Sequence, residues 1–265
     1  MKYLFERWDA LLDKLRDKFL FIFLDFDGTL APIARTPDKA VLPKKVRAVL
    51  EKLAQDPRVK LAFISGRRID SVKNKVGLKG VIYSGNHGLE IEGPKINFRP
   101  AVSPAYRVIL ERIKSDLEKK ISSIEGAFVE DKGLTLSLHY RLVDKSRVAE
   151  LKTIFHEAAV VYLARGKIRF KPGKMVLEVR PPVEWDKGRV VLWLLARQAF
   201  ALEKKNILPI YIGDDTTDED AFKALQNKGL TISVGRQKGS CAEYYLKSQG
   251  EVSGFLKRIS EVHYA

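Results

Sequence analysis

The chain has 265 residues, enough for one large domain or two unequal ones, and its 45% hydrophobic and 31% charged residues are ordinary for a globular protein. The formal net charge of +15 favours an anionic partner, but Lys and Arg are spread along the chain without the dense blocks typical of nucleic-acid binding. Apolar runs such as 190–196 are too short for a membrane span, and Cys241 is the single cysteine. These features predict a cytoplasmic protein that binds neither nucleic acid nor a membrane; the oligomeric state stays open, with a monomer as the default.

In chain order, the first element is an amphipathic helix with Leu4, Trp8, Leu11 and Leu15 on one face, which we expect to pack on the core. After it, apolar strands alternate with helical patterns, one of which begins at Pro43. This alternation predicts an α/β fold of Rossmann-like type, a mostly parallel sheet with helices on both faces. The runs that predict buried strands are 19–24, 59–64, 80–83, 207–212 and 230–234.

The middle of the chain has a different pattern, helix–strand–strand repeated twice. It predicts a small sheet with two helices on one face, as a domain at 103–183 inserted into a core of 1–102 and 184–265. Hairpin turns are expected at 131–133 and 171–173. The expected helices and strands lie at 106–117, 127–130, 134–140, 148–158, 167–170 and 175–179.

Polar residues follow four of the predicted core strands, at 25–29, 65–67, 84–88 and 213–220. Because the carboxyl ends of parallel strands meet at one edge of a sheet, we expect these segments to form one site. A turn or a helix cap is the alternative reading of an isolated Asp-x-Asp or of the acidic run at 214–220. Asp-Phe-Asp-Gly-Thr directly after a buried strand instead favours phosphate chemistry.

Phosphate monoester hydrolysis needs a nucleophile, a proton donor and positive charge that offsets the phosphate dianion. Asp25 is placed as the nucleophile and as a ligand of Mg²⁺, and Asp27 as general acid and later general base. Asp214 would be the second metal ligand, and Lys187 the remaining cation. Gly28 and Gly66 would keep the approach of backbone N–H groups to phosphate open, and Ser65 would donate to the phosphate.

These residues resemble the four motifs of the haloacid dehalogenase superfamily of phosphotransferases. Asp25 and Asp27 match the first motif, Ser65 the second and Lys187 the third; the fourth is matched by Asp214, Asp215 and Asp218. The resemblance implies Mg²⁺ held by the first aspartate, the backbone carbonyl of the second and a fourth-motif aspartate. It also implies that 103–183 is a cap domain of the α/β (C2) type.

Longer segments resemble the trehalose-6-phosphate phosphatase family, which implies hydrolysis of trehalose 6-phosphate to trehalose and phosphate. The most specific of these segments is 173–181, Gly-Lys-Met-Val-Leu-Glu-Val-Arg-Pro. The resemblance implies that its Lys174 and Glu178 contact sugar hydroxyls from one strand face. An exposed ion pair is the alternative for these two residues. The other matching segments are 25–33, 65–67, 85–90, 185–188 and 213–222. The remaining substrate-binding candidates are Gly28, Thr29, Gly66, Arg67, Asn86, His87, Glu90, His139 and Arg141.

Three other functions compete with this one. The nearest is the same chemistry on another sugar phosphate, of the sucrose-phosphate or mannosyl-3-phosphoglycerate type. A nucleic-acid-binding module on a degenerate phosphatase scaffold would need clustered basic and aromatic residues, and the retained carboxylates argue against it. A regulatory partner subunit of a trehalose-phosphate synthase is the third.

Overall fold

The computed structural model describes residues 1–201 and 206–264. The chain divides into two compact units, a core of 1–98 with 185–265 and a second unit of 99–184. The limits therefore lie at 98/99 and 184/185, where the sequence patterns gave 102/103 and 183/184. The expected α/β class, with a largely parallel sheet and a separate α/β insertion, is confirmed. No helix within the described ranges is long and apolar enough to cross a membrane.

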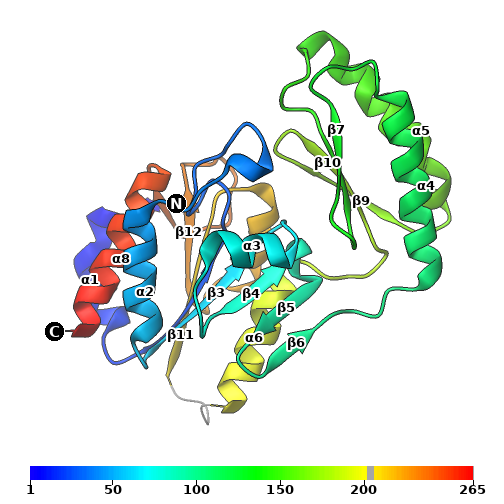
Figure 1. The fold of residues 1–265 in the computed structure, drawn as a ribbon. Helices are drawn as coiled ribbons and strands as arrows, with labels where there is room; N and C mark the ends of the chain where they lie inside the picture. Colours follow the sequence, from blue (N-terminus) through cyan, green and yellow to red (C-terminus); the bar gives the residue numbers. More distant parts are fainter. Residues whose placement is uncertain (202–205, 265) are drawn as a thin grey trace. The chain divides into compact units, whose positions relative to one another are not determined.

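The core unit contains a nine-stranded sheet in the order β1-β13-β12-β11-β2-β3-β4-β5-β6 (Figure 1). All neighbouring pairs from β1 to β4 are parallel, whereas β5 and β6 run antiparallel. The central strand β2 lies between β11 and β3, so Leu24 at its end pairs with Ile212 and Phe63. The strands are β1 Lys2–Tyr3, β2 Phe19–Leu24, β3 Val59–Ile64, β4 Ile82–Gly85, β5 Glu90–Gly93, β6 Ile96–Phe98, β11 Ile207–Gly213, β12 Leu230–Val234 and β13 Tyr244–Leu246.

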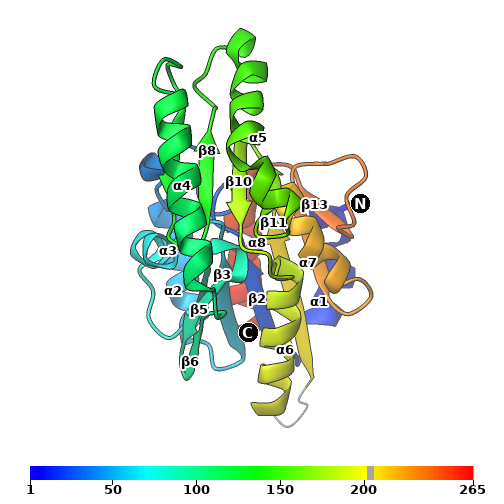
Figure 2. The ribbon, with the colours of Figure 1, turned by 90° about the vertical axis from the view of Figure 1, so that its right-hand side faces the viewer.

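Helices cover both faces of this sheet because β2 is apolar on both sides. Leu20, Ile22 and Leu24 pack in the cluster with α1 (Trp8–Leu15), α2 (Lys44–Gln55), α3 (Ile69–Val76) and α8 (Gln249–Tyr264). Phe21 and Phe23 face the opposite way, toward α6 (Lys187–Ala201) and α7 (Glu219–Ala224), which lie in front of the strands in Figure 2. Short 3₁₀ turns complete the core at η1 Leu4–Arg7, η2 Pro37–Lys39, η3 Asn86–Gly88 and η5 Thr216–Asp218.

The N-terminal segment packs on the core, as expected, but it is not one helix. Lys2–Tyr3 forms the edge strand β1, Leu4–Arg7 a 3₁₀ turn, and only Trp8–Leu15 is α-helical. Leu4, Leu11 and Leu15 are fully or almost fully buried in the core cluster. The early apolar residues therefore anchor the chain to the sheet edge beside β13.

The second unit has the predicted order, with helix–strand–strand occurring twice. Helices α4 (Pro104–Lys120) and α5 (Val148–Ala164) lie on one face of an antiparallel sheet in the order β7-β8-β10-β9 (Figure 1). Their apolar residues, among them Leu110 and Phe155, pack against Leu136, Leu138 and Val179. The strands are β7 Phe128–Asp131, β8 Leu136–His139, β9 Arg169–Gly173 and β10 Val176–Arg180, and η4 (Lys145–Arg147) precedes α5.

The second hairpin turn lies elsewhere than predicted. Residues 171–173 belong to β9, where Pro172 pairs with Leu177, and the turn is formed by Lys174 and Met175. Proline is accepted there because β9 is an edge strand. Met175 has the left-handed φ of 61° that this tight turn requires. Lys174 is thus a turn residue, and the prediction that it shares a strand face with Glu178 is wrong.

Candidate active site

The first motif follows β2 at the centre of the sheet. Asp25 is 6% exposed, and its backbone N–H donates to the carbonyl of Ile212 on β11 at 3.0 Å. The chain then turns back sharply, since the N–H of Leu30 donates to the carbonyl of Phe26 at 3.0 Å. Thr29 lies inside this turn, fully buried, with no hydrogen-bond partner for its hydroxyl among the described residues. The end of β2 therefore presents Asp25 from a buried position, directly before a turn that backbone hydrogen bonds close.

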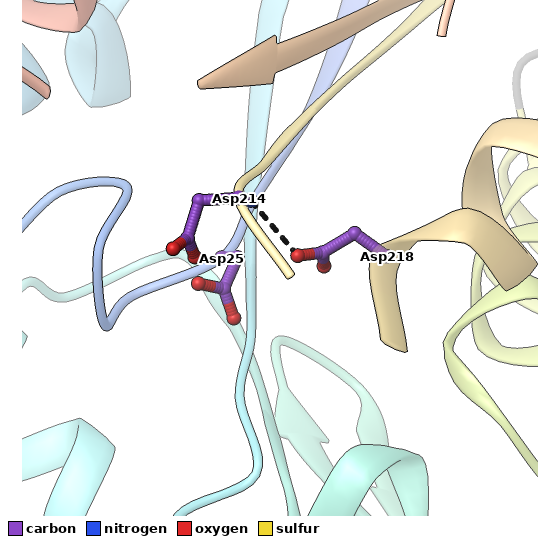
Figure 3. Close-up of side chains that lie close together, drawn as sticks. All are labelled: Asp25, Asp214 and Asp218. Atoms are coloured by element: carbon purple, nitrogen blue, oxygen red, sulfur yellow. Dashed lines mark hydrogen bonds between the residues drawn. The ribbon is translucent and has the colours of Figure 1, made fainter. Parts of the chain in front are cut away.

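The fourth motif brings two more carboxylates to the same place. Asp25, Asp214 and Asp218 are all buried, and each offers an oxygen within 4.8 Å of the others (Figure 3). Asp214 directly follows β11, the neighbour of β2, and Asp218 ends η5. Three carboxylates in one buried cluster repel one another unless positive charge lies between them, and an all-oxygen donor set is the kind that Mg²⁺ prefers.

Asp218 differs from the other two because protein donors already surround it. Oδ2 accepts the backbone N–H groups of Asp214 at 2.9 Å and Asp215 at 2.8 Å. Oδ1 accepts Lys187 Nζ and the Tyr211 hydroxyl, both at 2.7 Å. These four bonds make Asp218 the anchor of the fourth-motif loop, and they leave Asp25 and Asp214 as the carboxylates best placed for a cation.

Lys187 supplies the positive charge that the structure itself contains. Its ammonium is 2% exposed and lies 2.7 Å from Asp25 Oδ1 and 2.7 Å from Asp218 Oδ1. Burial alone would lower the pKa of Lys187, but the carboxylates of Asp218 and Asp25 overcome this and raise it. Burial raises the pKa of Asp25 well above its ordinary value; Lys187 opposes this rise, whereas Asp218 and Asp214 add to it.

Gly28 is needed where the first and fourth motifs meet. Its φ is +88°, and a Cβ built on it would lie 2.1 Å from Asp214 Oδ2. Its own N–H donates to the carbonyl of Ala31 at 2.7 Å. The glycine thus permits the close approach of Asp214. Its expected role in keeping the approach to phosphate open stays a prediction.

The second motif continues from β3. Ser65 is 1% exposed, its backbone N–H bonds the carbonyl of Ser84 at 2.9 Å, and its Oγ accepts the N–H of Arg67 at 3.2 Å. A Cβ at Gly66 would lie 2.4 Å from His87 Nε2, so the imidazole rests directly on this glycine. His87 is therefore brought next to the second motif although it follows a different strand.

The loop after β4 is held in an unusual conformation. Asn86 and His87 both have left-handed φ values, 48° and 56°. Asn86 is fully buried, and its amide donates to Glu90 Oε2 at 2.7 Å. Three of the predicted substrate-binding residues therefore lie in this one loop. Asn86 and Glu90 are hydrogen-bonded to each other, and His87 is partly exposed beside Gly66.

Two candidate residues have side-chain partners that the sequence did not indicate. Arg67 forms a two-point ion pair with Asp27, Nε to Oδ2 and Nη2 to Oδ1, both at 2.6 Å. Asp215 caps η5 through bonds from the backbone N–H of Thr216 at 2.6 Å and its hydroxyl at 3.1 Å. Asp215 therefore lies outside the cluster of Asp25, Asp214 and Asp218.

Glu178 lies in the second unit within a buried polar network. Its Oε1 accepts from Lys132 at 3.0 Å, Ser137 at 3.2 Å and Thr135 at 3.3 Å, and its Oε2 accepts from Arg180 at 2.5 Å. At 3% exposure the carboxylate is not part of an exposed surface pair. Its position is fixed by four groups on β10, β8 and the loop between β7 and β8.

The other candidates of this unit gather at the end of the same sheet. The Arg141 Nη2 donates to the carbonyl of Lys174 at 2.9 Å, and the Lys174 side chain is exposed. His139 pairs across the sheet with Val176, and its Nε2 lies 2.7 Å from Glu130 Oε2. His139, Arg141 and Lys174 are thus neighbours beside the β9–β10 turn.

Sequence reasoning missed the groups that hold these side chains. Tyr211 is the clearest, since its hydroxyl binds Asp218, and burial together with that carboxylate raises its pKa. In the sequence it is one apolar-looking residue of an apolar strand. The tyrosine hydroxyl, which must find a partner when buried, was the only available signal. Lys132 and Arg180, the cations around Glu178, gave no signal above the many other charged residues.

The largely parallel sheet, the inserted α/β unit and the carboxylate cluster are the arrangement of a haloacid dehalogenase fold with a cap domain. The family model for trehalose-phosphatase matches residues 23–250. The chain is 35% identical to trehalose-phosphate phosphatase B of Arabidopsis thaliana, over 96% of this chain and 70% of that protein. It is 37% identical to a probable trehalose-phosphate phosphatase 4 of Oryza sativa subsp. japonica, with the same coverage.

Solved structures agree with this assignment. The C-terminal domain of trehalose-6-phosphate phosphatase from C. albicans superposes with a TM-score of 0.84 at 25% identity, over 98% of this chain and 99% of that one. Sequence and fold thus indicate the same family. The chain belongs to the trehalose-phosphatase family.

Proposed function

We propose that this protein is a Mg²⁺-dependent phosphatase that hydrolyses trehalose 6-phosphate to trehalose and phosphate. The observation that carries the proposal is the convergence of Asp25 and Asp214, at the ends of the neighbouring strands β2 and β11, with Lys187 at the start of α6, in a chain of this family. Cys241 is a free thiol, in keeping with the expected cytoplasmic location. That location and a monomeric state stay predictions.

In the proposed mechanism Asp25 attacks phosphorus, and the sugar oxygen leaves as Asp27 gives it a proton. The resulting aspartyl-phosphate is then hydrolysed by a water molecule that Asp27, now a carboxylate, deprotonates. Lys187 fixes Asp25 Oδ1 through both steps, and Ser65 donates to the phosphate.

The residues present fit a magnesium ion. Asp25 and Asp214 would hold it, with the backbone carbonyl of Asp27 as the family resemblance implies, while Asp218 keeps the loop in place. When bound, the ion supplies positive charge that offsets the repulsion between phosphate and these carboxylates. The absence of any Cβ at residue 28 is what allows Asp214 to come this close.

A substrate panel tests the function directly. Phosphate release would be measured with trehalose 6-phosphate, glucose 6-phosphate, sucrose 6-phosphate and mannosyl-3-phosphoglycerate, each with Mg²⁺ and with EDTA. We expect kcat/KM for trehalose 6-phosphate to exceed the others by at least about 100-fold, because hydrogen-bonding sites reject ligands that leave their groups unpaired. Equal turnover of glucose 6-phosphate would contradict the assignment. Preference for sucrose 6-phosphate or mannosyl-3-phosphoglycerate would make that compound the substrate.

Lys174→Ala is expected to raise KM for trehalose 6-phosphate about tenfold and to leave p-nitrophenyl phosphate hydrolysis unchanged, since a charged hydrogen bond contributes about 1.5 to 3 kcal/mol. Lys174 is exposed and lies in a turn, where an ammonium can donate to a sugar hydroxyl. Lys145→Ala, at an exposed lysine of the same unit, is the matched control. Equal loss on both substrates would assign Lys174 a structural role.

Gly28→Ala is expected to weaken activation by Mg²⁺ about 10- to 100-fold, the usual effect of disturbing a metal ligand's surroundings. The added methyl would displace Asp214, from which the ideal Cβ position is 2.1 Å away. Gly80→Ala is the control, because Gly80 also has a positive φ, +76°, but a Cβ there meets nothing within 4 Å. Magnesium titration of activity gives the comparison, and equal curves for the two variants would refute a specific role for Gly28.

A further inference from the structure

Arg67 was expected to bind substrate, but its hydrogen bonds point to another role. Nε and Nη2 bind the two oxygens of Asp27 at 2.6 Å each, and Nη2 also donates to the carbonyl of Pro37 at 2.8 Å. The Arg67 side chain is 8% exposed, and its guanidinium lies 5.4 Å from the centre of the Phe26 ring. The guanidinium therefore binds groups of the protein, the Asp27 carboxylate and the Pro37 carbonyl.

The backbone of Arg67 is fixed as firmly as its side chain. Its N–H donates to Ser65 Oγ at 3.2 Å, and its carbonyl accepts the N–H of Asn86 at 2.7 Å. Asp27, by contrast, is 38% exposed and lies in a turn that is closed by a backbone bridge to Ala31. Within this pair, Arg67 is the rigid partner and Asp27 is the side chain that is held.

We propose that Arg67 is the positioning residue of the general acid–base Asp27, and that it does not contact the phosphate. The inference rests on the proposed function, because it assigns a partner to a residue of that mechanism. A planar guanidinium that binds both carboxylate oxygens fixes the rotation as well as the position of the carboxylate. Each oxygen keeps a second lone-pair position, which can carry the proton that Asp27 gives to the sugar oxygen and later accept a proton from water, so Asp27 can act while it is held.

Misplacing Asp27 should slow the two chemical steps selectively. A sugar is a poor leaving group and needs the proton from Asp27, whereas p-nitrophenolate leaves without one. Hydrolysis of the aspartyl-phosphate needs Asp27 as a base whatever the substrate was. Loss of Arg67 should therefore slow release of trehalose and slow the second step, but spare release of p-nitrophenolate.

The experiment compares Arg67→Ala, Arg67→Lys and wild type in rapid mixing with p-nitrophenyl phosphate and in steady state with trehalose 6-phosphate. For Arg67→Ala we expect kcat on the sugar to fall about 100-fold, within the range of general acid–base catalysis. With the aryl phosphate we expect a burst of one p-nitrophenolate per enzyme followed by slow turnover. Arg67→Lys should behave like Arg67→Ala, because an ammonium cannot bind both oxygens. Arg68→Ala, at the exposed neighbour that faces Asp70, should match wild type.

A double-mutant cycle separates positioning from a general structural role. If Arg67 acts through Asp27, Arg67→Ala should change the activity of Asp27→Asn by no more than about twofold. Additive losses, a raised KM with unchanged kcat on both substrates, or full activity of Arg67→Lys would each overturn the inference. A wild-type protein that releases no phosphate from either substrate would instead refute the proposed function itself.

Discussion

Asp25→Asn is expected to lower kcat by at least about 10⁴-fold, the scale on which removal of a nucleophile acts. An amide cannot attack phosphorus, and the other carboxylate of the turn after β2, Asp27, is bound through both oxygens by Arg67. The fold should survive, because asparagine has nearly the same shape and Lys187 keeps its second partner, Asp218, at 2.7 Å. Removing the charge also removes the cost of burying a carboxylate, the effect that raises the pKa of Asp25.

The measurement combines phosphate release with detection of covalent phosphate on acid-quenched protein by intact mass. Wild type should carry one phosphoryl group during turnover, and the variant none. Asp70→Asn, at an exposed carboxylate on α3, is the control for a loss of negative charge in the same unit. Appreciable turnover by Asp25→Asn would show that another group is phosphorylated.

The central part of the fold could be predicted because its strands are buried on both faces. The runs at 19–24 and 59–64 coincide with β2 and β3, and the polar residues after β2 and β11 meet as expected. The edge strand β1 and its neighbour β13 were missed because they have only two and three residues. Two or three residues are too few to show the alternation of apolar and polar side chains that indicates a strand.

Side-chain partners could not be predicted in the same way. Arg67 and Asp27 are 40 residues apart, and nothing in either local pattern distinguishes that pair from other combinations of charges. The β9–β10 turn was misplaced because Pro172 and Gly173 are typical turn residues, whereas Lys174 and Met175 are not. In both cases the outcome depends on contacts between segments.

Lys187→Met is expected to destabilise the core unit by about 3 to 5 kcal/mol and to abolish activity, as happens when one partner of a buried ion pair is removed. Methionine has a similar length but no charge. In wild type the Lys187 ammonium lies 2.7 Å from Asp25 and 2.7 Å from Asp218. Without it, these two carboxylates and that of Asp214 would repel one another with no buried ammonium among them. With that cation gone, the pKa of Asp25, already raised by burial, should rise further.

The sign of the pH dependence follows from this rise. A carboxyl whose pKa is higher in the folded than in the unfolded protein destabilises the fold as pH increases from about 4, the unfolded value, up to its folded value. The deficit of Lys187→Met relative to wild type should therefore be smaller at pH 5 than at pH 8. In wild type the raised pKa of Lys187 keeps its stabilising charge through this whole range.

Urea unfolding of both proteins at pH 5 and pH 8, with and without Mg²⁺, measures the effect. Added Mg²⁺ should stabilise Lys187→Met more than wild type, because the ion restores positive charge to the cluster. Lys60→Met is the matched control: this half-buried lysine donates at 2.8 Å to the neutral Gln198 Oε1, so its loss should cost no more than about 1 kcal/mol. A deficit for Lys187→Met that is equal at both pH values would mean that lost packing, and not the unpaired carboxylates, destabilises the variant.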